Sequence, residues 1–228
     1  MGDTKHFTDF SIISLGSRCW SRTLWNSFNL VNTETRKWRM PFDGCITSYK
    51  SLLSLLDNDF DNVFSKLRKS VTGKIFLTEF QNFQHEKTDD LENFKEQEHF
   101  RIKQFYDEIN FHIKEKKTLV FFLTYARYPR KLISLLKDKF PKLKFKIFCI
   151  SIWPSKKQEK SINDEFCYFT RMEVPSAKKA ENIIHFGKTT EGQVFEKKVL
   201  EELLNFLTEL SGVPYDLDEI FSARKDIS

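Results

Sequence analysis

Cysteine is scarce in this sequence, and its spacing excludes several kinds of site. Four cysteines are spread over 228 residues, and no C-x-x-C pair occurs. A disulfide-stabilised scaffold, a zinc knuckle and a thioredoxin-type redox site are therefore excluded. Cys149 lies in the apolar run FKIFCISI and Cys167 in EFCYF, so we expect both to be small, buried side chains.

Long apolar runs are also missing. The segment TLVFFLTYA (118–126) has half of the roughly 18 residues that a membrane-spanning helix needs, so we expect no membrane span. The N-terminal segment MGDTKHFTDF carries two aspartates and lacks the apolar region of a signal peptide. We therefore expect a cytoplasmic location.

Glycine-rich, metal-binding and nucleic-acid-binding patterns are absent as well. The sequence has no Walker or dinucleotide glycine pattern and no complete G-x-S-x-G turn. Its five histidines lack the spacing of metal ligands, and we expect neither a metal nor a cofactor. The net charge of +5 is modest, with lysines interleaved among apolar residues as in KLKFKIF. Because nucleic-acid binding needs a clustered basic face or a known module, we expect no such partner.

Strand-like and helix-like segments alternate in the second half of the chain. TLVFFLTY (118–125) and FKIFCISIW (145–153) predict buried strands, and PRKLISLLKDKF (129–140) between them predicts an amphipathic helix. Such a β-α-β unit favours parallel pairing with a right-handed crossover. A further strand is expected within 165–174, and a long amphipathic helix within 192–212.

The first half combines strands, turns and one long helical segment. FSIISLG (10–16) predicts a buried strand that ends at Gly16. A helix with Trp20, Leu24 and Phe28 on one face should follow, then a loop over 32–40 and a PFDG turn at 41–44. We expect helical spacing over 46–60 and one or two short strands in 74–86. A long helix is expected over 88–117, with an inward stripe formed by Phe94, Ile102, Phe105, Ile109 and Ile113.

Together these patterns predict an α/β fold with a mostly parallel sheet flanked by helices, of a Rossmann-like or esterase-like kind. Residues 1–215 are expected to form a single α/β domain. Residues 216–228 are expected to form a peripheral C-terminal tail.

The Gly-Ser-Arg-Cys turn after the first strand is the clearest candidate for chemistry. In open α/β sheets the functional crevice lies beyond the carboxyl ends of the strands. Cys19 falls in the first turn of the following helix, where free amides and the helix dipole favour a thiolate. Arg18 and Arg22 add positive charge, and amides near Gly16 and Ser17 are suited to binding an oxyanion or a phosphate. The alternative is that Cys19 simply packs between helix and sheet.

A nucleophilic cysteine needs a base. His85 and His185 each follow an apolar run, and the residues alone rank them equally. His99 and His112 belong to the long helical segment and are expected at its surface or boundary. The candidate acids that would orient the imidazole are Asp43, Glu86, Asp89 and Asp90.

Several short motifs resemble a known family. SLGSRC (14–19), PFDG (41–44), DNDF (57–60), FQH (83–85), FRIKQF (100–105) and TLVFFL (118–123) occur in the order typical of the bacterial family described as papain-like cysteine peptidases, whose function is largely uncharacterised. The resemblance covers roughly residues 10–150. Gly44 stands where the family has Trp, and Glu86 stands where it usually has Asp.

The resemblance implies that Cys19 is the nucleophile, His85 the base and Asp43 a structural or orienting acid. It also implies a papain-like α+β fold, which disagrees with the strand-turn-helix pattern around Gly16. We expect a thiol-dependent hydrolase or acyltransferase that acts on a small-molecule, glycan or peptide substrate. The alternatives are a nucleotide-sugar or phosphate-binding transferase without a covalent intermediate, and a non-catalytic binding module with Trp38 as an exposed anchor.

Overall fold

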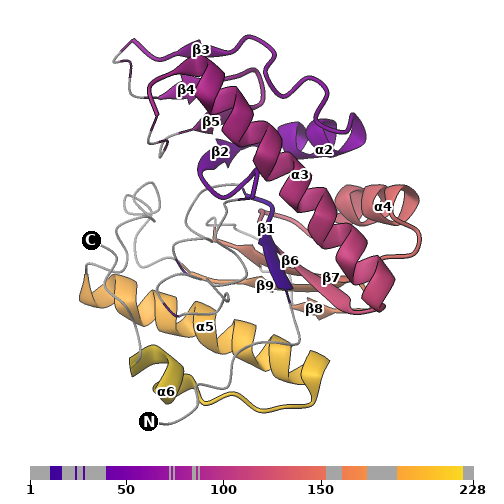
Figure 1. The fold of residues 1–228 in the computed structure, drawn as a ribbon. Helices are drawn as coiled ribbons and strands as arrows, with labels where there is room; N and C mark the ends of the chain where they lie inside the picture. Colours follow the sequence, from indigo (N-terminus) through magenta and orange to yellow (C-terminus); the bar gives the residue numbers. More distant parts are fainter. Residues whose placement is uncertain are drawn as a thin grey trace, which may run out of the picture.

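A computed structural model describes residues 11–16, 24, 28, 40–71, 73, 75–83, 86, 88–152, 161–173 and 189–222. Its main feature is a five-stranded sheet flanked by helices (Figure 1). The strand order is β1 (Ser11–Ser14), β6 (Thr118–Thr124), β7 (Lys144–Ser151), β9 (Cys167–Arg171) and β8 (Ile162–Asn163). The first four strands run parallel, and only β8, at the edge, is antiparallel. The predicted α/β class with a mostly parallel sheet is confirmed.

Alternate side chains of the parallel strands enter two different cores. In β6, Leu119, Phe121 and Leu123 pack with α2 (Tyr49–Asp57), α3 (Leu91–Glu115) and α4 (Arg130–Lys139). Val120 and Phe122 point to the opposite face and pack with α5 (Thr190–Ser211). Because both faces are covered, these strands are continuous apolar runs in the sequence.

The ends of the helices explain most of the predicted boundaries. Pro129 precedes α4, where its missing amide hydrogen is not needed. The Thr189 hydroxyl accepts from the amide of Gly192 at the start of α5, and Gly212 ends that helix with a φ of +70°. Strands β6 and β7 pair in parallel, and α4 lies between them in the chain, which confirms the predicted β-α-β unit.

A second, antiparallel sheet lies apart from the parallel one (Figure 1). Its order is β2 (Cys45–Thr47), β5 (Gln81–Phe83), β4 (Phe76–Leu77) and β3 (Arg68–Lys69). Strands β4 and β5 confirm the short strands expected in 74–86. The helical prediction for 46–60 is correct only for Tyr49–Asp57: Ile46 belongs to β2 and pairs with Asn82, and residues 58–60 form turns.

Helix α3 connects the two sheets, as Figure 1 shows. Phe94, near its start, packs with Phe76 and Phe83 of the small sheet. Phe105 and Ile109, further along, pack in the core of the parallel sheet. The predicted inward stripe is confirmed. The surface or boundary position expected for His112 is wrong: it is 2% exposed, because it returns to the inward face seven residues after Phe105.

The face of the sheet that carries α5 also receives side chains from both ends of the chain. Leu24 and Phe28 are buried there, and the Phe28 amide donates to the Leu24 carbonyl one helical turn earlier. Phe221 of α6 (Leu217–Ser222) stacks on Phe28 with ring centroids 5.5 Å apart. Trp20, the third member of the expected stripe, lies outside the described residues. Among the helices of the described part, none has the length and apolar character needed to cross a membrane.

Candidate functional site

Several predicted site residues lie outside the described residues. They are Ser17, Arg18, Cys19, Arg22, His85 and His185, together with Trp38 of the expected loop. Gly16, Asp43 and Glu86 are described, as are the chain segments next to Cys19 and His85. The geometry of the candidate site is therefore built from these neighbours.

Gly16 lies at the carboxyl edge of the parallel sheet. Its carbonyl accepts from the Thr124 amide at 3.0 Å and from the Thr124 hydroxyl at 3.2 Å. Its amide donates to the Ser14 hydroxyl over 3.3 Å, a long hydrogen bond that a stronger acceptor can replace. The φ of +90° is one that side chains disfavour, so glycine is needed for the chain to turn here.

The PFDG motif forms the expected turn. The Asp43 amide donates to the Met40 carbonyl at 3.1 Å, and the Asp43 carboxylate accepts from the Met40 amide at 2.9 Å. Phe42 anchors the turn, since its buried ring lies 5.6 Å from that of Phe60 and 6.3 Å from that of Phe105. Asp43 thus closes the turn from its own side chain, and Phe42 fixes the turn to the main core.

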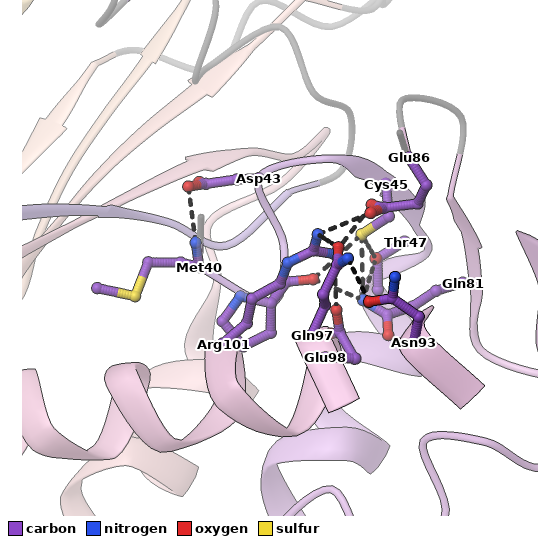
Figure 2. A network of polar contacts seen from close by, with 11 residues as sticks. Met40, Asp43, Cys45, Thr47, Gln81, Glu86, Asn93, Gln97, Glu98 and Arg101 are labelled. Carbon is purple, nitrogen blue, oxygen red and sulfur yellow. Dashed lines mark hydrogen bonds and ion pairs between the residues drawn. The ribbon is translucent and has the colours of Figure 1, made fainter. Parts of the chain in front are cut away.

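A buried amide ties this turn to strand β5. The Gln81 Nε2 group lies 3.2 Å from the Pro41 carbonyl, 3.1 Å from Cys45 Sγ and 3.2 Å from Thr47 Oγ1 (Figure 2). The Cys45 thiol donates to the same Pro41 carbonyl at 3.4 Å. Burial raises the pKa of Cys45 far above its usual range, so this thiol is a neutral part of the network.

The turn at Gly16 lies against this network. A Cβ atom added to Gly16 would lie 3.7 Å from Cβ of Thr47, which is van der Waals contact. Thr47 pairs with Gln81 across the β2–β5 ladder, and Cys45 pairs with Phe83. The described parts of the SLGSRC, PFDG and FQH motifs are therefore in contact through β2 and β5.

A buried charge cluster lies beside the same ladder. Arg101 of α3 donates to both carboxylate oxygens of Glu86, at 2.9 and 2.7 Å, and to Glu98 at 3.0 Å (Figure 2). The side chains of Glu86 and Glu98 are 1% and 0% exposed. Burial raises the pKa of Glu98 to about 8, although the neighbouring guanidinium opposes the shift.

Sequence reasoning did not identify Glu98 and Arg101 as a buried pair. The signal was present in the helical spacing. Glu98 lies four residues after Phe94, and Arg101 lies four residues before Phe105, so both fall on the inward stripe of α3. Opposite charges on an otherwise apolar helix face indicate a buried ion pair.

The other described cysteines show no nucleophilic character. Cys149 and Cys167 are fully buried, as expected, and burial raises the pKa of each thiol well above its usual range. Hydroxyl side chains lie at the carboxyl ends of β6 and β7, at Thr124 and Ser151. Within the described ranges, no group of three or more His, Cys, Asp or Glu side chains could hold a metal ion.

Comparisons with models of protein families, with curated proteins and with solved structures found no match. The likeness to the papain-like cysteine peptidase family therefore rests on the short motifs alone.

Proposed function

We propose that this protein is a thiol-dependent hydrolase or acyltransferase with Cys19 as nucleophile, His85 as base and Asp43 as the orienting acid. One observation carries the proposal. The described residues that flank the three motifs lie together: Gln81 of β5 donates to the Pro41 carbonyl of the PFDG turn, and Gly16 packs beside Thr47 of β2, which pairs with Gln81.

Chain connectivity supports the pairing of these motifs. The ladder ends at Phe83, opposite Cys45, which is two residues after Asp43. His85 is two residues after Phe83, and two peptide units span at most about 7 Å. On the other side, Glu86 directly follows His85 and is fixed by Arg101. Cys19 is three residues after Gly16, which itself contacts β2.

The proposed chemistry is acyl transfer. The Cys19 thiolate attacks a substrate carbonyl carbon, and the thiol proton is held by His85. Collapse of the tetrahedral intermediate breaks the bond to the leaving group, which takes that proton. Water or an acceptor nucleophile then cleaves the thioester. The turn at Gly16 would supply amides for the oxyanion, where an anion can displace the long bond to the Ser14 hydroxyl.

We further infer that this chemistry is carried by an esterase-like or Rossmann-like sheet and not by a papain-like α+β fold. Strand β1 is parallel to β6 and leads directly into the turn at Gly16. Nucleophiles at such strand-to-turn junctions lie at the edge where α/β proteins bind ligands. A glycan-related or peptide substrate is proposed from the motif resemblance alone.

A second candidate function is favoured by one further observation. The Ser151 hydroxyl at the carboxyl end of β7 is 1% exposed and has no hydrogen-bond partner among the described residues. Buried hydroxyls are normally satisfied, so a ligand at this edge would supply the missing partner. A nucleotide-sugar or phosphate-binding transferase would use this edge and the Gly16 turn without forming a thioester. Concentration-dependent thermal stabilisation by nucleotide sugars would support it.

The experiment for the first proposal is alkylation of the intact protein by iodoacetamide across pH, with each cysteine quantified by mass spectrometry. Cys45, Cys149 and Cys167 are buried internal controls and should react only on unfolding. Cys19 should react with a midpoint well below the ordinary thiol pKa of about 8.5. The midpoint should rise in His85→Ala and stay unchanged in His185→Ala. An ordinary midpoint that neither variant alters would overturn the proposal.

A further inference from the structure

We propose that Arg101 is a positioning residue for the proposed base: it fixes Glu86, the residue directly after His85, by a bidentate ion pair. This inference rests on the proposed function, and it gives a role to Arg101, which lies in the FRIKQF motif (100–105) but received no role from the sequence.

The contact between Arg101 and Glu86 has the geometry of a specific clamp. Two guanidinium nitrogens donate to two different carboxylate oxygens, at 2.9 and 2.7 Å. Both side chains are almost completely buried. A planar guanidinium fixes the orientation of a carboxylate, which a lysine ammonium cannot do with a single nitrogen. Glu86 is one residue after His85, so its orientation limits the backbone that leads to the imidazole.

The clamp is attached to a rigid support. Arg101 is on α3, whose Phe94 packs in the small core and whose Phe105 packs in the main core. The Glu98 carboxylate accepts from Arg101 Nη1 at 3.0 Å and supports it from its own helix. The position of Glu86 is therefore set by the packing of the whole helix.

The contacts around Arg101 favour Glu86 as its main partner, since Glu86 accepts from two guanidinium nitrogens and Glu98 from one. Two carboxylates face one guanidinium, and burial raises the pKa of Glu98 to about 8. Burial thus favours the neutral form of Glu98, although the guanidinium opposes this. A second negative charge on Glu98 would compete for the guanidinium and weaken the clamp.

The predicted consequence is a change in the acidity of Cys19. When Glu86 is no longer fixed, the proposed thiolate–imidazolium pair of Cys19 and His85 should form less often. The alkylation midpoint of Cys19 then rises, while its reactivity at high pH, where every thiol is ionised, stays the same. A residue with a purely structural role would lower stability without moving this midpoint.

The test measures the Cys19 alkylation midpoint in Arg101→Gln, Arg101→Lys and Glu86→Gln, together with their thermal unfolding. We expect the midpoint to rise by about one pH unit, a tenfold loss of thiolate, in Arg101→Gln and Glu86→Gln. In Arg101→Lys the midpoint should rise less than in Arg101→Gln, because lysine keeps the positive charge but cannot donate from two nitrogens. Lys103→Gln is the matched control, because Lys103 forms an exposed pair with Asp107 on the same helix; it should leave the midpoint unchanged.

The outcomes separate this inference from the proposed function. If folded Glu86→Gln and Arg101→Lys keep the low midpoint of the wild type, the positioning role is wrong and the proposed function stands. If wild-type Cys19 itself has an ordinary midpoint, the proposed function fails and the positioning role fails with it. Because Glu86→Gln keeps the size of the side chain, it decides the matter even if Arg101→Gln does not fold.

Discussion

The interiors of the two sheets differ in what they bury. The core between the parallel sheet and its helices is mainly aliphatic and aromatic, and each of its buried polar side chains lies on a different strand or helix: Ser14, His112, Thr124, Ser151, Thr170 and Glu196. The small sheet and the first half of α3 enclose charged and polar groups instead, namely Thr47, Gln81, Glu86, Glu98 and Arg101. Apolar burial stabilises a fold without fixing single contacts, whereas buried ion pairs cost desolvation energy and set specific geometry. The difference indicates that the first region mainly stabilises the fold, whereas the second fixes the relative positions of the side chains and strands that it contains.

The largest expected effect is in the apolar region. Phe148 is fully buried, and its ring lies 5.6 Å from that of Phe122 and 5.2 Å from that of Phe206. Phe148→Ala should lower the free energy of unfolding by about 3–5 kcal/mol, because it removes apolar contacts and leaves a cavity. Denaturant unfolding at two pH values checks this, and the loss should be the same at both. A loss that depends strongly on pH would contradict the division of roles.

The second prediction concerns the charged region. Arg101→Met should lower the free energy of unfolding by about 3 kcal/mol, because it leaves the buried carboxyl groups of Glu86 and Glu98 without the guanidinium that binds both. The triple variant Arg101→Met, Glu86→Gln, Glu98→Gln should be more stable than Arg101→Met alone, since no uncompensated charge remains. Denaturant unfolding of both variants tests this. A triple variant that is less stable than the single one would mean that the ion pairs themselves stabilise the fold.

The third prediction uses pH. The pKa of Glu98 in the folded protein is raised to about 8, so the folded state holds this proton more tightly than the unfolded state does. The stabilisation from protonated Glu98 is complete below about pH 4.5, the ordinary pKa of the group, and is lost as pH rises toward 8. The free energy of unfolding should fall by at most about 5 kcal/mol as pH rises through this window, at about 1.4 kcal/mol for each pH unit between the two pKa values.

The control for this pH effect is Glu98→Gln, which carries no titrating proton. The difference in stability between wild type and variant should change steadily between pH 5 and 8 and then level off. Parallel curves for the two proteins across that range would show that Glu98 ionises at its ordinary pKa.

The smallest expected effect is at the junction of the two regions. Gly16 has a φ of +90°, and a Cβ there would find ordinary contact with Thr47 at 3.7 Å. Gly16→Ala should therefore cost about 1–2 kcal/mol from backbone strain and not from a clash. Thermal unfolding measures the loss, and Gly73→Ala, at another glycine with positive φ but with open space around it, is the matched control. A much larger loss at Gly16 would indicate that the turn is more tightly enclosed than the described contacts show.

The same contrast explains how much of the structure was predictable. Strands β6, β7 and β9 and helices α4 and α5 are evident in the sequence, because apolar runs and helical stripes are local patterns. Strand β2 was assigned to a helical segment, since its three residues are defined by pairing with β5 and not by their own spacing. Glu98 and Arg101 were passed over because charged helix residues are usually exposed, and only the fold brings Glu86 to them.

The PFDG motif was predictable only in part. The sequence predicts a turn there, and the turn forms. Phe42 packs against Phe105 in the main core, and the Pro41 carbonyl accepts a hydrogen bond from Gln81. Both contacts join residues that are far apart in the chain. The contacts of Phe42 and Pro41 could therefore not be predicted from the motif itself.

The central claim is that Cys19 and His85 meet at the edge of the parallel sheet. The most direct measurement is cross-linking with a dihaloacetone, whose two alkylating carbons are separated by a single carbonyl, followed by peptide mass spectrometry. The account predicts a Cys19–His85 cross-link in the native protein that disappears in His85→Ala and persists in His185→Ala. Alkylation of Cys19 without any cross-link to His85 would contradict it.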